Sequence, residues 1–263
     1  MLTPLAGEIA VVTGAAQGLG EAIARALAAA GAQVAVTGRR EEPLRSIADS
    51  LGHGHAVVLL DVCSTQSVEA AADSVAGLLG EATILVNNAG VNRIGPAEAV
   101  TDDDWDDVLD TNLKGAFRCS RTFGTRMLAA RRGCIVNVGS IIGAVTAMPG
   151  RAPYAASKAG LVGLTRVLAI EWASRGVRVN AVLPGPTRTP MVEDAIARGI
   201  LDEQQIADRT PAGRLALPEE IAAAVCLLAC AEAGFVTGQT LVVDGGYVTY
   251  GAAGPLSPWL PPG

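Results

Sequence analysis

The sequence has 263 residues, half of them hydrophobic, which is enough for a buried core and excludes disorder as the main state. It carries 20 basic and 26 acidic residues, a net charge of −6, so it lacks the excess positive charge that a nucleic-acid partner requires. Asn, Ser, Gly or Pro interrupts both long uncharged stretches, 133–150 and 245–263, so no membrane partner is expected.

Short apolar runs alternate with helical patterns along the chain. Strands are predicted at 9–13, 33–37, 56–60, 83–87, 134–138, 177–182 and 240–244, and helices in the first part at 18–30, 41–51 and 64–79. Continuous apolar strands between helices indicate a parallel sheet covered on both faces. We therefore predict one doubly wound α/β domain over 1–250, followed by a Pro/Gly-rich tail, 251–263, that either packs over a neighbouring subunit or is a loose end.

Histidine and cysteine are too few and too poorly placed for several kinds of site. The two histidines, His53 and His55, are interpreted as part of a solvated turn and not as a hydrolase or zinc site. The five cysteines include no C-x-x-C pair, and the N-terminus lacks the features of a signal peptide, so a reducing, cytoplasmic location is expected. The acidic run 102–107 follows Thr101, a helix N-cap residue, and is interpreted as a helix start; no metal site is predicted.

Glycines follow the first predicted strand and open the next helix, in the segment 13–20. At such a junction backbone N–H groups and the helix dipole can hold a pyrophosphate, although glycines also serve tight turns for their shape alone. The segment 87–90, Ser140 and the pair Pro184–Gly185 follow later strands, so all of them should meet at the carboxyl edge of the sheet. Tyr154 and Lys158, four apart on a predicted helix, share one face.

Taken together, these motifs resemble the short-chain dehydrogenase/reductase family, in its ordinary-length subgroup, over residues 7–246. The matching features are T-G-x-x-x-G-x-G at 13–20, Asp61, N-N-A-G at 87–90, Asn112 in Thr-Asn-Leu-Lys-Gly, Ser140, Y-x-x-x-K at 154–158, the segment 184–189 and the ending 235–246. The resemblance implies a single Rossmann domain with a seven-stranded parallel sheet. It also implies hydride transfer between a nicotinamide cofactor and a secondary alcohol or ketone, and a homotetramer assembled through 105–131, 154–175 and 240–244.

Proton transfer to a carbonyl oxygen requires an acid/base, and Tyr154 is the candidate because histidine is confined to one turn. Lowering a tyrosine pKa from about 10 by about 3 units takes roughly 4 kcal/mol. A cation about 4 Å away in a partly screened site supplies about that much, and Lys158 is suitably spaced to do so, helped by the positive ring of an oxidised nicotinamide. The resemblance adds that Lys158 bonds the nicotinamide ribose, Ser140 holds the substrate oxygen and Asn112 anchors a water in a proton relay.

NADP(H) is favoured over NAD(H) for two reasons. Gly38 stands where NAD enzymes usually carry a carboxylate, and the planar guanidinium of Arg39 can bind a 2′-phosphate through two hydrogen bonds. Glu41, Glu42 and the uncharged Gln17 oppose this preference. The predicted cofactor-binding residues are Gly14, Gln17, Gly18, Leu19, Gly20, Arg39, Arg40, Asp61, Val62, Asn88, Ala89, Gly90, Tyr154, Lys158, Pro184, Gly185, Thr187 and Thr189.

The sequence leaves the substrate open among 3-oxoacyl compounds, polyols or sugars and other small carbonyl compounds. The resemblance makes 186–215 the substrate lid. Arg151 is interpreted either as a contact for an anionic substrate or as an exposed loop arginine, and Asn92–Arg93 resemble sugar-acid and polyol reductases of the family. The alternatives are an enoyl reductase, whose Tyr and Lys are more widely spaced, and a non-catalytic nucleotide-binding sensor, which typically lacks the Tyr or Lys retained here.

Overall fold

Seven parallel strands form the centre of the computed structural model, which describes residues 4–250. The strands are β1 (Ile9–Thr13), β2 (Gln33–Gly38), β3 (Ala56–Leu59), β4 (Ile84–Asn87), β5 (Gly133–Val138), β6 (Val177–Pro184) and β7 (Thr240–Val243). Their order across the sheet is β3-β2-β1-β4-β5-β6-β7, so the chain winds outward in both directions from the boundary between β1 and β4. This is the predicted doubly wound Rossmann architecture.

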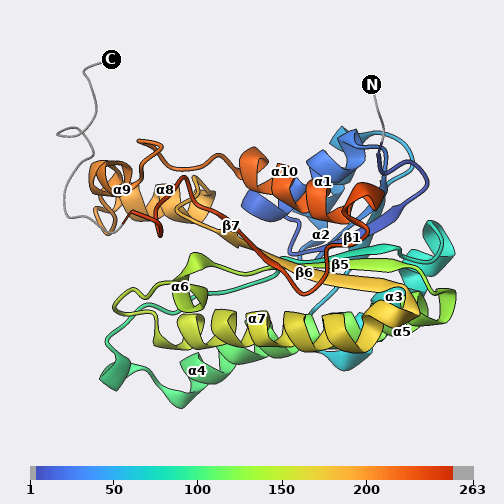
Figure 1. The fold of residues 1–263 in the computed structure, drawn as a ribbon, viewed down its shortest axis with the longest axis horizontal. Helices are drawn as coiled ribbons and strands as arrows, with labels where there is room; N and C mark the ends of the chain where they lie inside the picture. Colours follow the sequence, from blue (N-terminus) through green and yellow to red (C-terminus); the bar gives the residue numbers. More distant parts are fainter. Residues whose placement is uncertain (1–3, 251–263) are drawn as a thin grey trace.

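Helices cover both faces of the sheet (Figure 1). On one face lie α1 (Gly18–Ala29), α2 (Glu41–Leu51) and α10 (Pro218–Ala229); on the other lie α3 (Thr65–Leu78), α4 (Asp102–Leu109), α5 (Ala116–Ala130) and α7 (Ala152–Trp172). Alternate strand residues enter the two cores. Val11 packs on the α3–α5–α7 side, whereas its neighbours Ala10 and Val12 pack on the α1–α10 side. Most residues of the central strands are therefore apolar because both faces of these strands are buried.

Short elements complete the chain. They are the 3-10 turns η1 (Ala97–Ala99), η3 (Ala173–Arg175) and η4 (Ala231–Ala233), the π-helical turn η2 (Asp110–Gly115), and the helices α6 (Ile141–Ala144), α8 (Pro190–Ala197) and α9 (Glu203–Arg209). The predicted helix starts are present: Ser64 accepts the N–H of Ser67, and Thr101 accepts that of Asp104. The acidic run after Thr101 thus begins α4, and the carboxylates of its first turn, Asp102, Asp103 and Asp104, face the positive end of the helix dipole.

The segment 52–55 forms the predicted turn, but His55 has a structural role in it. Its Nδ1 accepts the N–H of Val34 at 3.1 Å, at the start of β2, and partial burial lowers the pKa of its imidazole. His53 is exposed. Within residues 4–250, no cluster of three or more His, Cys, Asp or Glu side chains is arranged to hold a metal ion, and no helix is long and apolar enough to cross a bilayer.

Candidate active site

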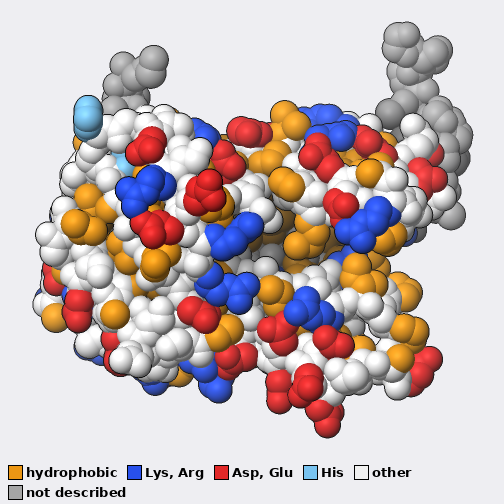
Figure 2. All heavy atoms as spheres, turned by 180° about the vertical axis from the view of Figure 1, so that it is seen from behind, with side chains coloured by type: hydrophobic (Ala, Val, Ile, Leu, Met, Phe, Trp, Pro, Cys, Tyr) orange, Lys and Arg blue, Asp and Glu red, His pale blue; other side chains and the backbone are white. Residues whose placement is uncertain are grey.

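A cavity of about 760 Å³ lies where the segments that follow the strands converge. Figure 2 shows the surface hollowed between two lobes, with Lys and Arg side chains on both sides of the hollow. Every residue of the predicted catalytic and cofactor-binding sets contributes to the cavity wall except Arg40 and Asn112. The segments expected to meet at the carboxyl edge of the sheet therefore line one cavity.

The glycine turn after β1 is bonded directly to the segment after β4. The side-chain oxygen of Thr13 accepts the backbone N–H groups of Asn88 and Ala89, both at 3.0 Å. In return, the Asn88 amide donates to the carbonyl oxygens of Thr13 and Gly14 at 3.0 and 3.1 Å. These reciprocal bonds fix two strand ends as one rigid corner of the cavity.

Two glycines of this turn are required by close backbone approach. Gly14 has φ +66°, and a Cβ atom there would lie 2.9 Å from the Cα of Ala89. A Cβ on Gly20 would lie 2.3 Å from the carbonyl oxygen of Gly14. Gln17, at the N-cap of α1, makes no side-chain capping bond, so the N–H groups of the first helical turn are left for a ligand. This cradle fits the pyrophosphate of a dinucleotide.

Basic and acidic side chains follow β2 and β3. Arg39 is exposed, lines the cavity and makes no ion pair within residues 4–250, whereas Arg40 lies outside the wall and donates to Gln17 Oε1 at 3.4 Å. A side-chain oxygen of Asp61 accepts the N–H of Cys63 at 3.0 Å. Sequence reasoning missed the buried Arg118, which donates to the carbonyl oxygen of Val62 at 3.3 Å and to Asp110 at 3.0 Å. It holds the loop after β3 against η2.

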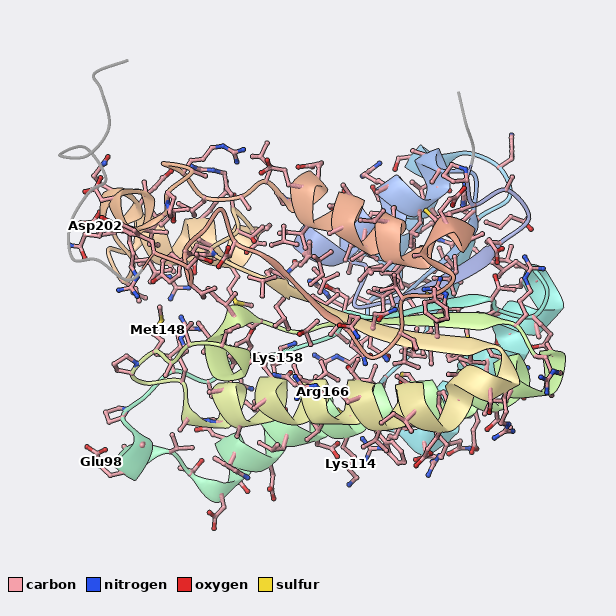
Figure 3. The ribbon with its side chains drawn as sticks, viewed as in Figure 1. Glu98, Lys114, Met148, Lys158, Arg166 and Asp202 are labelled. Atoms are coloured by element: carbon pink, nitrogen blue, oxygen red, sulfur yellow. The ribbon has the colours of Figure 1, made fainter. Side chains whose placement is uncertain are left out.

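Ser140, Tyr154 and Lys158 lie together in the cavity wall. Lys158 is buried between α7 and the sheet (Figure 3), and its Nζ donates to the carbonyl oxygen of Val138 at 2.8 Å. That Nζ is 5.6 Å from the centroid of the Tyr154 ring. Ser140 ends the loop after β5 and hydrogen-bonds the Tyr154 side chain. The Tyr154 phenol, the Ser140 hydroxyl and the buried Lys158 amine thus lie in the wall of the same cavity.

Burial has the largest effect on both titrating groups of this trio. It raises the pKa of Tyr154, while the hydrogen bond from Ser140 and the positive charge of Arg151 act in the opposite direction. Burial also lowers the pKa of Lys158 to about 8. From the sequence, Lys158 was expected to lower the tyrosine pKa, helped by the positive ring of an oxidised nicotinamide. In the structure Ser140 and Arg151 oppose the effect of burial, and the pKa of Tyr154 is still raised.

Asn112 sits in η2 with its amide fully occupied by protein partners. Its Oδ1 accepts the N–H of Val91 at 2.8 Å, and its Nδ2 donates to the Val91 carbonyl at 2.9 Å and to Ser157 Oγ at 3.1 Å. The side chain is buried and does not line the cavity. It therefore joins the loop after β4 to the beginning of α7, and its predicted part in a proton relay stays a prediction.

The segment 186–215 contributes an apolar wall opposite the trio. Met191 and Val192 of α8, Leu201, and Ile206 of α9 line the cavity. An ion pair between Arg188 and Glu203 connects the start of this segment to the first residue of α9. Thr187 and Thr189 of this segment were predicted from the sequence and line the cavity. The apolar lining residues of α8 and α9 were not identified, because short amphipathic helices carry no marker of which residues face a ligand.

Three comparisons agree on the relatives of this chain. The family described as Enoyl-(Acyl carrier protein) reductase matches residues 14–248. The chain is 42% identical over 242 residues to 3-oxoacyl-[acyl-carrier-protein] reductase FabG of Escherichia coli (strain K12), covering 91% of this chain and 97% of the relative. It is 44% identical over 248 residues to D-threitol dehydrogenase of Mycolicibacterium smegmatis, covering 92% and 94%.

A solved structure of gluconate 5-dehydrogenase from Burkholderia cenocepacia J2315, in complex with NADP and tartrate, is similar to the whole fold. Its TM-score is 0.89 at 34% identity, covering 95% of this chain and 98% of that one. The fold and the cavity define a dinucleotide-dependent oxidoreductase built on one Rossmann sheet.

The chain belongs to the short-chain dehydrogenase/reductase family. It is an NAD(P)-dependent oxidoreductase of secondary alcohols and ketones, so the predictions of family, fold and reaction class are confirmed.

Proposed function

We propose that this enzyme interconverts a ketone and a secondary alcohol with NADP(H) as its preferred cofactor and Tyr154 as the acid/base. The observation that carries the proposal is that Tyr154, Ser140 and Lys158 line the same cavity as the glycine cradle. The nicotinamide, when bound, supplies or accepts the hydride. A sensor without turnover does not need such a trio.

Each residue of the trio has a distinct proposed task. In the direction of reduction, the Tyr154 hydroxyl gives its proton to the carbonyl oxygen as negative charge develops there. Ser140 donates a hydrogen bond to that same oxygen and orients it. Lys158, held by Val138, keeps a positive charge next to the phenol and bonds the cofactor ribose. Asn112 positions the neighbouring loop through Val91 and Ser157.

The predicted cofactor-binding residues are proposed to hold the cofactor from one end to the other. Gly14, Gly20 and the first turn of α1 would hold the pyrophosphate, and Asp61 and Val62 would border the adenine. Arg39 supports a preference for NADP(H), because its guanidinium lines the wall and makes no ion pair within the described residues. Gly38 next to it offers no carboxylate to repel a 2′-phosphate.

A homotetramer is the proposed assembly. On α7, Val167 and Ile170 are 52% and 81% exposed, and Phe235, close to β7, is fully exposed. Apolar side chains presented on the surface in this way support burial against other copies of the chain. The domain boundaries, the lid over 186–215, the cytoplasmic location and the absence of nucleic-acid and membrane partners stay predictions, and the tail 251–263 lies outside the described residues.

A substrate panel tests the reaction. The relatives are named for 3-oxoacyl-[acyl-carrier-protein], D-threitol and gluconate, so the panel should contain 3-oxoacyl thioesters, four- to six-carbon polyols and sugar acids. Nicotinamide absorbance, followed with NADP(H) and NAD(H) in both directions, should identify a substrate turned over by the wild type and not by Tyr154→Phe. A panel without turnover, or with equal turnover in both proteins, would contradict the proposal.

A further inference from the structure

Arg151 places a cation at the edge of the proposed active site. It immediately precedes α7, three residues before Tyr154, and it lines the same cavity as Tyr154 and Ser140. Its side chain is partly buried, and this desolvation lowers the pKa of its guanidinium. Sequence reasoning left Arg151 open between an anion contact and an exposed loop arginine; the structure places it in the wall.

The charge of Arg151 has no counter-ion in the described part of the chain, where its side chain makes neither a hydrogen bond nor an ion pair. Asp107, one of two carboxylates in the cavity wall, lies 2.7 Å from Arg93, so its charge is already paired. The other, Asp61, accepts the N–H of Cys63 in the loop after β3. A partly desolvated cation without a partner is unfavourable, and an anionic ligand would remove that cost.

The backbone around Arg151 is fixed on both sides. The carbonyl oxygen of Gly150 accepts the N–H of Gly95 at 3.1 Å, and that of Arg151 accepts the N–H of Ala155 at 2.8 Å within the first turn of α7. The guanidinium therefore extends from the same rigid helix end that carries Tyr154. A ligand anion bound by Arg151 would be held at a set position relative to the phenol, which is the condition for productive orientation.

The charge of the surrounding wall favours one class of substrate over another. Met148 and Arg209 line the cavity as well, and the Arg209 guanidinium lies 4.8 Å from the centroid of the Tyr247 ring, without an ion pair within residues 4–250. Across the cavity wall, basic side chains thus outnumber the two carboxylates. An uncharged polyol would leave Arg151 uncompensated, whereas an acid would neutralise it.

We propose that Arg151 binds the carboxylate of a small hydroxy or oxo acid whose alcohol or carbonyl group reacts at Tyr154. This inference rests on the proposed function, because it places the anion in the same cavity. Its planar guanidinium suits a carboxylate, which it can bind through two parallel hydrogen bonds. Arg151 is then the specificity-determining residue that separates sugar acids from polyols.

A matched pair of ligands tests this assignment. D-threonate and D-threitol have the same four-carbon skeleton and differ in one terminal group, a carboxylate in the acid and a hydroxymethyl group in the polyol. Their dissociation constants should be measured by calorimetry on the NADPH-saturated protein, in which neither alcohol can be oxidised, for the wild type, Arg151→Gln and Arg45→Gln. Arg45 is an exposed residue of α2 outside the cavity wall and controls for the loss of one positive charge.

The wild type should bind threonate more tightly than threitol. Arg151→Gln should weaken threonate binding about 10- to 100-fold, the range of a charge-assisted hydrogen-bonded pair, and leave threitol binding unchanged. Arg45→Gln should change neither. The proposal would be overturned by a wild type that binds threonate no better than threitol, or by an Arg151→Gln protein that binds threonate normally or loses both ligands equally.

A second readout separates this role from an effect on Tyr154. If Arg151 served only to lower the pKa of the phenol, Arg151→Gln would shift the pH profile of kcat equally for acid and polyol substrates, and the change in KM would not depend on the carboxylate. Turnover also distinguishes the two proposals. A protein that binds threonate through Arg151 but oxidises no alcohol would refute the proposed function and leave the anion site standing.

Discussion

Lys158 Nζ and the carbonyl oxygen of Val138 are 2.8 Å apart and share a hydrogen bond. The bond attaches the first turns of α7 to the last residue of β5, so the ammonium group has one fixed direction in a buried setting. A single neutral acceptor does not compensate for the lost hydration of a cation. The pKa of Lys158 therefore falls to about 8, within the range where enzymes are assayed.

The affinity for NADPH should depend on this ionisation. As pH rises from 7 to 9, Lys158 loses its proton, and a charge-assisted bond to the cofactor becomes a neutral one, which weakens binding about five- to tenfold. Fluorescence titration of NADPH across this range measures the effect. Lys158→Met should bind weakly at every pH, and Lys158→Arg, which stays charged, should show no decline. An affinity for the wild type that is flat between pH 7 and 9 would contradict the expectation.

Tyr154→Phe should separate catalysis from binding. The substitution removes the proton donor and keeps the ring, so turnover should fall by about 10²–10⁴ while the melting temperature and the NADPH dissociation constant stay near those of the wild type. Steady-state kinetics on a substrate found by the panel provides the measurement. A near-normal kcat in this variant would show that another group transfers the proton.

Arg39 and Arg40 form a natural pair for testing cofactor choice, since Arg39 lines the cavity and Arg40 does not. Arg39→Ala should raise the KM for NADPH about 10- to 100-fold and leave the KM for NADH nearly unchanged, because only NADPH carries the 2′-phosphate. Arg40→Ala should have the smaller effect. Equal losses with both cofactors, or a wild type that prefers NADH, would refute the preference for NADP(H).

Assembly can be tested with a charge on the exposed face of α7. Ile170→Glu should convert the expected tetramer to smaller species in light scattering coupled to gel filtration, because burying an unpaired carboxylate in an apolar interface is unfavourable. Leu78→Glu is the matched control: Leu78 is 62% exposed at the end of α3, outside the predicted interface. A wild type that is monomeric at micromolar concentration would remove the basis for this prediction.

The sequence predicted those parts of the site whose placement follows from the sheet. Ser140 follows a strand, and Tyr154 and Lys158 share a helix face, so their meeting at the strand ends could be expected from topology alone. The acceptor of Lys158 could not be predicted, because a main-chain carbonyl such as that of Val138 has no signature in the sequence. The contact of Arg118 with Val62 joins residues 56 positions apart and depends on how α5 packs.

The structural environment of Asn112 could also not be predicted from the sequence. The pattern of its neighbours is equally compatible with an α-helix, whereas the structure places residues 110–115 in the π-helical turn η2. The resemblance to a family selected Asn112 as a residue, but the bonds that occupy its amide come from the three-dimensional structure.

The two short helices after β6 have one further consequence, which concerns how this enzyme can change. Neither α8 nor α9 contains a buried residue, yet both contribute side chains to the cavity wall. Substitutions at sites outside a packed core usually alter stability by no more than about 0.5 kcal/mol. Mutations in this segment can therefore reshape the wall while the sheet, the glycine cradle and the Tyr154 trio remain intact, which makes residues 190–209 a tolerant region for natural divergence and for directed evolution of new substrate ranges.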